Sequence, residues 1–267
     1  DYNVEHILRR AELHRIGGRS LGTNHGVVTN FCSLFPQWRY ISFDIYYTFG
    51  KPLCVPYLST WAKDMTLRSS GVFGLPRETI ISGWPPGEAI LISARVAWNE
   101  PEFVRMVHAI ADAFPKRQIL IQVKRGYISD DEIEGYTTDW GVGHSNVSHT
   151  TDSIYALLAQ ARYYISDVST VIAEAMHLGV PVLFADVIDQ EYSVYREFPG
   201  LSLRTADELV ERLRALEDGR ETYPHEQYRK LMDLDHGNTI YDLVRDDVGL
   251  PPLKYNETAL NTPRMTG

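Results

Sequence analysis

Short apolar runs alternate with helical patterns from residue 88 to residue 185, and this alternation limits the fold more than any other feature of the sequence. The apolar runs are AILISA (89–94), QILIQV (118–123), YYISD (163–167) and VPVLFA (180–185). The helical patterns between them are EPEFVRMVHAIADAF (100–114), DSIYALLAQA (152–161) and STVIAEAMHLG (169–179). Strands without polar alternation are covered by helices on both faces. The pattern therefore predicts an α/β fold with a doubly wound parallel sheet.

The chain before residue 88 is less regular and reads as helix, strand, loop, strand, helix, strand. The opening helix pattern ends at Gly17-Gly18, and the expected strands are RSLGTN (19–24), YISFDIYYTFG (40–50) and TIISG (79–83). The following WPPG (84–87) is the clearest linker signal in the chain, because proline and glycine interrupt both helices and strands.

Three further helices are expected near the C-terminal end of the chain, at 205–218, 225–234 and 238–247. We therefore divide the chain into three parts: a partial first α/β segment at 1–85, a Rossmann-like domain at 86–225, and C-terminal helices with a tail at 226–267.

Charge and composition exclude several classes of function. The net charge is −9, from 26 basic and 35 acidic residues, whereas general nucleic-acid binding needs clustered cations. No apolar run reaches the ~20 residues of a membrane span. Cys32 and Cys54 form neither a disulfide framework nor a metal pattern, and we expect no signal peptide. We expect a cytoplasmic protein.

The stretch YYISDVSTVIAEAMHLGVPVLFAD (163–186) carries the most chemistry. A strand ends at Asp167, and Ser169 and Thr170 then open a helix whose free N–H groups can hold a phosphate. Glu174 lies four residues beyond Thr170, so it shares a helix face and can reach a sugar hydroxyl beside that phosphate. Open α/β sheets bind ligands at the carboxyl ends of their strands, which is where these residues lie.

The same residues have a purely structural interpretation. Ser169 or Thr170 can simply cap the helix, and Glu174 can be a solvated helix residue. We favour the functional interpretation because the residues occur together and are followed by Gly179-Val180-Pro181.

The pattern Asp167-x-Ser169-Thr170-x-x-x-Glu174, followed by Gly179-Val180-Pro181-Val182, resembles the nucleotide-binding end of GT-B-fold glycosyltransferases. It is most similar to the families of bacterial surface-polysaccharide synthesis and of CDP-glycerol glycerophosphotransferases. The resemblance implies a GT-B-like fold with a truncated or reduced first domain, and it extends over about residues 5–220.

Three earlier stretches carry the resemblance backwards: SLGTNHGVV, DIYYTFGK and GVFGLPRETIISGWPP. The first matches a strand that ends in His-Gly, and in the relatives this histidine is taken as the catalytic base. The resemblance therefore implies that His25 is the general base, since neutral imidazole can deprotonate an acceptor hydroxyl near pH 7. The alternative is a buried histidine bonded to a backbone carbonyl.

Three weaker donor-site candidates follow from the resemblance. Arg95 follows the first strand of the second domain, where many GT-B enzymes place a diphosphate-binding arginine. Lys124 ends the second strand, but the His-Pro that follows this lysine in relatives is replaced by Arg125-Gly126. His149 is expected after the third strand, near where a nucleotide base would stack.

The resemblance also implies the chemistry. The donor would be a nucleotide-sugar or CDP-polyol, and the acceptor a glycan or lipid-linked glycan, with peripheral contact at the inner face of the cell membrane. The glutamate pair typical of retaining enzymes is absent, because Val182 stands eight residues beyond Glu174, and this favours inversion. No His/Asp/Glu cluster has metal-ligand spacing, so we expect metal-independent chemistry without a cofactor.

Alternatives remain. A nucleotide-sugar 2-epimerase shares the fold, although FADVIDQEYSVY replaces its T-E-R-P-E-type segment. A non-catalytic nucleotide- or glycan-binding subunit is the other alternative. Because the first domain is short, the chain is either part of a longer enzyme or a reduced form of the fold.

Overall fold

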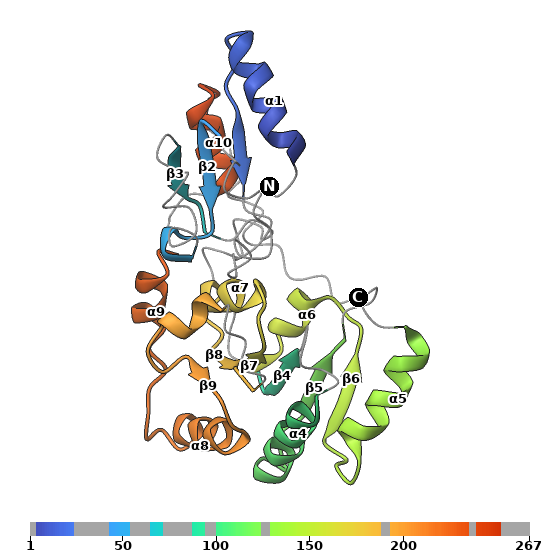
Figure 1. Cartoon of the computed structure of the whole chain (residues 1–267). Coiled ribbons are helices and arrows are strands. Elements are labelled where there is room, and N and C mark those ends of the chain that lie inside the picture. The colour runs from blue at the N-terminus through green and yellow to red at the C-terminus, as the bar shows by residue number, and fades with distance from the viewer. Residues whose placement is uncertain are drawn as a thin grey trace.

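The computed structural model describes residues 4–23, 43–53, 65–71, 87–93, 100–123, 129–187, 193–234 and 239–251. These residues form two parallel sheets, shown one above the other in Figure 1. The second, larger sheet has the order β6-β5-β4-β7-β8-β9. Its strands are β4 (Ala89–Ser93), β5 (Ile119–Gln122), β6 (Val147–Thr150), β7 (Ala161–Ser166), β8 (Val182–Ala185) and β9 (Ser202–Leu203).

Successive residues of these strands enter different cores, because side chains alternate between the two faces of a sheet. Leu91 and Phe184 belong to one hydrophobic cluster, whereas Ile92 and Leu183 belong to the other. The first core is covered by α6 (Ile154–Leu158), α7 (Val171–His177) and α9 (His225–Leu231). The second is covered by α4 (Pro101–Ala113), α5 (Asp130–Gly141) and α8 (Ala206–Glu217). The predicted doubly wound sheet is thus confirmed.

The strand order determines where a ligand can bind. The chain builds outward from β4 through β5 to β6, and then returns to add β7 on the other side of β4. β4 and β7 are therefore central neighbours whose following connections lead to opposite faces. In open parallel sheets the crevice for ligands lies at this switch point, outside the carboxyl ends of the strands.

The first sheet has the order β1-β2-β3 within the described residues, with strands Leu21–Thr23, Ile45–Thr48 and Thr66–Ser69. Helix α1 (Val4–Arg15) lies against it. Asp44, just before β2, receives hydrogen bonds from the backbone N–H (2.6 Å) and hydroxyl (2.9 Å) of Ser20 and contacts Nε2 of His14 at 2.8 Å. A single carboxylate thus links α1, β1 and β2.

Several contacts among the described residues join the first segment to the second. After β2 the chain forms the short 3₁₀ helix η2 (Lys51–Leu53). Leu53 of this helix and Phe49 just before it belong to the same core as α7 and α9. The backbone passes so close to Met232 that a Cβ on Gly50 would lie 1.8 Å from the Met232 carbonyl oxygen. Beyond α9, the chain returns to the first sheet through α10 (Ile240–Asp247), which is drawn near β2 in Figure 1 and contacts Tyr47 of β2 and Arg68 of β3 through Asp247.

The predicted helices and strands of the regular region are confirmed, as are the opening helix and the three C-terminal helices. Within the described residues, the sequence interpretation gave no bounds for α5, for the strands β3 and β6, for the two-residue β9 or for the 3₁₀ helices η2 and Val194–Glu197. The expected strand at 79–83 lies outside the described residues. None of the described helices has the length and apolar character needed to cross a membrane.

Candidate functional site

Three hydroxyl groups meet where β4 and β7 end. Ser93 Oγ lies 2.5 Å from the hydroxyl of Tyr164 and 3.2 Å from Oγ of Ser166. All three residues are buried. Burial raises the pKa of Tyr164 to about 12, although its hydrogen bonds to serine hydroxyls favour the charged form. A cluster of neutral, hydrogen-bonded hydroxyl groups thus lies at the switch point, and the sequence interpretation did not foresee it.

Ser169 and Thr170 lie at the start of α7, shortly after Ser166 in the chain, as the sequence predicted. Oγ of Ser169 accepts the backbone N–H of Val171 at 3.2 Å, and its carbonyl accepts the hydroxyl of Tyr195 at 2.8 Å. Thr170 is the N-cap residue, yet its side chain makes no capping hydrogen bond. Both residues are partly exposed. Ser169 thus has a local structural role, and its backbone is held in place by a buried tyrosine from η4 (Val194–Glu197).

Glu174 is buried, with 8% of its surface exposed, so the interpretation as a solvated helix residue is wrong. Its Oε1 accepts a hydrogen bond of 3.1 Å from the hydroxyl of Tyr155 in α6. Burial raises the pKa of the Glu174 carboxyl above its ordinary value, while the Tyr155 hydrogen bond opposes that shift. Among the described residues Tyr155 alone donates to this carboxylate. A buried carboxylate with so few partners is an unusual group to keep in a core without a function.

The structure corrects the expected position of His149. This residue lies inside β6 rather than after a strand, it pairs with Ile121 of β5, and its side chain is exposed. β6 is the edge strand of the described sheet, and β5 and β4 lie between it and β7. The reason is that the polar sequence VSHT forms an edge strand, which tolerates polar side chains on exposed positions. Base stacking by His149 stays a prediction.

His25, Arg95 and Lys124 lie outside the described residues. Their roles as general base and as contacts of the donor phosphates therefore stay predictions.

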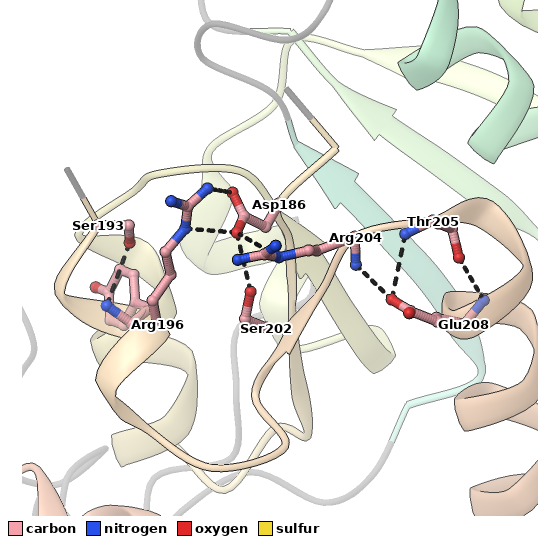
Figure 2. A network of polar contacts seen from close by, with 8 residues as sticks. Asp186, Ser193, Arg196, Ser202, Arg204, Thr205 and Glu208 are labelled. Carbon is pink, nitrogen blue, oxygen red and sulfur yellow. Dashed lines mark hydrogen bonds and ion pairs between the residues drawn. The ribbon is translucent and has the colours of Figure 1, made fainter. Parts of the chain in front are cut away.

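A second polar group, centred on Asp186, lies at the carboxyl end of β8 and was also missed by the sequence interpretation. Figure 2 shows Arg196 approaching this carboxylate with two nitrogens, at 2.6 and 2.7 Å. Ser202 donates a hydrogen bond of 3.1 Å, and Nε of Arg204 lies 3.9 Å away. The Asp186 side chain has no exposed surface, whereas two-thirds (66%) of the Arg204 side chain is exposed. This group ties η4 and β9 to the end of β8.

No family model matches the sequence, and no match is found among curated proteins. Solved structures do match the fold. The calicheamicin glycosyltransferase CalG4 matches with a TM-score of 0.51 and 16% identity, over 92% of this chain and 64% of that one. A variant of the wall teichoic acid polymerase TagF matches with a TM-score of 0.57 and 15% identity, over 87% and 69%.

The third comparison is the UDP-GlcNAc 2-epimerase from Neisseria meningitidis bound to UDP-GlcNAc, with a TM-score of 0.52 and 14% identity. The match covers 85% of this chain and 68% of that one. The chain thus spans about two-thirds of the length of these structures. At such identities the likeness concerns the fold, and together with the parallel sheets it shows a GT-B-like α/β fold, as the sequence predicted.

Proposed function

We propose that this chain binds a nucleotide-activated donor at the carboxyl edge of β4 and β7, and that it serves transfer of a sugar or polyol phosphate to a hydroxyl acceptor. The donor would be a nucleotide-sugar or a CDP-polyol, and the acceptor a glycan or lipid-linked glycan. The observation that carries the proposal is the buried Glu174, held by Tyr155 beside the switch point of a GT-B-like fold.

Glu174 would bind the nucleotide, because a buried carboxylate gains most from a partner that donates hydrogen bonds, as ribose hydroxyls do. Ser169 and Thr170, both partly exposed just before it, would offer hydroxyl groups to the donor phosphates. Two proteins of this fold support the assignment by what their names state, since one is a glycosyltransferase and another holds UDP-GlcNAc.

The transfer step would proceed as follows. His25 takes the proton of the acceptor hydroxyl, and the acceptor oxygen forms a bond to the anomeric carbon of the donor sugar. The bond between that carbon and the diphosphate oxygen breaks, and the nucleoside diphosphate leaves with the electron pair. With a CDP-polyol, the oxygen instead attacks the β-phosphorus, and CMP leaves. Replacing His25 by alanine should abolish most turnover while preserving nucleotide affinity.

Calorimetric titration of CMP, CDP, UDP, GDP and ADP tests the proposed donor site first. We expect micromolar binding of one nucleotide and at least about tenfold weaker binding in Glu174→Gln, which keeps the side-chain shape but removes the charge. The matched control is Glu226→Gln, since Glu226 is an exposed glutamate on α9. If none of the five nucleotides bound, or if both variants behaved like the wild-type chain, the proposed site would be wrong.

Product analysis then separates the transferase from its alternatives. Conversion of the donor to an epimer without acceptor would indicate the 2-epimerase reaction, whose fold this chain shares. Binding without turnover under any acceptor would indicate a non-catalytic nucleotide-binding subunit.

A further inference from the structure

Tyr155 and Glu174 come from different helices and meet beside the candidate site. α6 precedes β7 and α7 follows it, and the two helices lie side by side at the same end of the sheet in Figure 1. The Tyr155 hydroxyl donates to Oε1 of Glu174 at 3.1 Å, and the tyrosine ring packs against the core that contains α7. Packing therefore restrains both partners of this hydrogen bond: the ring of Tyr155 packs against the core, and Glu174 is buried.

A carboxylate has two oxygens, and this hydrogen bond uses one of them. Among the hydrogen bonds of the described residues, the bond from Tyr155 is the one that Glu174 accepts through its side chain. We propose that Tyr155 is a positioning residue for Glu174: its hydroxyl holds Oε1, so that Oε2 remains for a hydroxyl group of the bound nucleotide. This inference rests on the proposed function.

The electrostatic setting makes the proposal testable. Burial raises the pKa of the Glu174 carboxyl, and the Tyr155 hydrogen bond lowers it. Among the described residues, Tyr195 from η4 is also electrostatically linked to Glu174, and burial raises the pKa of its hydroxyl well above the ordinary value. Both tyrosines are therefore neutral at pH 7. Loss of the Tyr155 hydroxyl should let the buried carboxyl hold its proton to higher pH.

The first measurement is the ¹³C NMR titration of the Glu174 carboxyl, assigned by its loss in Glu174→Gln. In Tyr155→Phe we expect the pKa of this carboxyl to rise by about one unit. The matched control is Tyr223→Phe, which removes a buried hydroxyl that donates to the carbonyl of Val182 at 2.9 Å and does not contact Glu174. An unchanged carboxyl pKa in Tyr155→Phe overturns the positioning role.

The second measurement is the affinity for UDP and for CDP between pH 5 and 8 in the wild-type chain and in both tyrosine variants. In Tyr155→Phe the pH below which affinity falls should move upward together with the carboxyl pKa, whereas Tyr223→Phe should keep the wild-type profile. An unmoved profile overturns the inference alone if Glu174→Gln still weakens binding. If Glu174→Gln binds UDP and CDP as the wild-type chain does, the proposed nucleotide site fails as well.

Discussion

Asp44 shows, at the scale of one residue, how much local structure a partly buried acceptor can organise. Its two oxygens receive the backbone and hydroxyl of Ser20 and the ring of His14, and Arg10 lies 3.9 Å away. Burial of Asp44 opposes its ionisation, but the hydrogen bonds from Ser20 and His14 outweigh burial and lower its pKa to about 2. The charged form of this side chain therefore supports the contact between α1 and the start of β2.

This dependence predicts a loss of stability in acid. A carboxyl whose pKa is depressed in the folded state stabilises that state above its unfolded pKa, near 4, and the contribution is lost as the pH falls to about 2. Since the Asp44 side chain is 23% exposed, solvent screening reduces the expected loss to about 1–2 kcal/mol. Urea unfolding at pH 2 to 6 measures it. Asp44→Asn should be less stable at pH 6 and should show a shallower acid loss; identical slopes would contradict the role of Asp44.

At the scale of elements, η4 is a short 3₁₀ helix that connects the ends of two neighbouring strands. Tyr195 donates to the carbonyl of Ser169 after β7, while the next residue, Arg196, binds Asp186 after β8. Two adjacent residues of η4 thus bind the segments that follow β7 and β8 at the carboxyl edge of the sheet. The element contributes to the candidate site without supplying a group that the proposed mechanism uses.

The two arginines beside Asp186 should differ strongly in their effect on stability. Arg196 is 20% exposed and binds the buried carboxylate with two nitrogens, so Arg196→Gln should cost on the order of 3 kcal/mol by leaving that charge without its main partner. Arg204 is 66% exposed and 3.9 Å away, so Arg204→Gln should cost less than about 1 kcal/mol. Guanidinium unfolding curves at pH 7 compare the two variants. Equal losses would mean that Asp186 does not depend on the fork geometry of Arg196.

Elements with strong periodicity could be predicted from the sequence, and the missed elements have a common physical reason. Strands β4, β5, β7 and β8 of the second sheet are almost entirely buried and therefore read as apolar runs, as AILIS does in β4. The missed β6 and β3 have the sequences VSHT and TLRS, and no residue of either strand is buried. Helix α5 was missed because its sequence is mostly polar, although Ile133 and Trp140 are buried beneath it.

The candidate site was predictable only where one continuous stretch carries it. Ser169, Thr170 and Glu174 share one strand–helix unit, and the structure places them there. Tyr155, by contrast, lies 19 residues before Glu174 on another helix, and Asp186 gains its partners from η4 and β9. Such contacts depend on tertiary packing, and no spacing rule within one element reveals them.

At the scale of the whole molecule, a late helix of the chain, α10, packs back against the first sheet. Helix α10 places Asp247 against side chains of the paired strands β2 and β3, where it accepts hydrogen bonds from Tyr47 at 2.8 Å and from Arg68 at 2.5 Å. These contacts join residues 200 and 179 positions apart. α10 has no residue in the core, whereas the Asp247 side chain is only 6% exposed, so we expect its polar contacts to contribute strongly to the attachment of the helix.

Removing Asp247 should therefore release α10 without unfolding the second sheet. In Asp247→Ala, the buried hydroxyl of Tyr47 and the guanidinium of Arg68 lose their shared acceptor, and we expect α10 to open locally at a cost of about 2 kcal/mol. Hydrogen exchange followed by mass spectrometry should show faster exchange in α10 and in β2 and β3, with unchanged protection in β4 and β7.

The neighbouring Asp246→Ala is the matched control. Asp246 is exposed, and its replacement removes the same kind of charge from the same helix. If both variants gave the same exchange pattern, apolar contacts would hold the helix instead, and Asp247 would not be needed to attach α10 to β2 and β3.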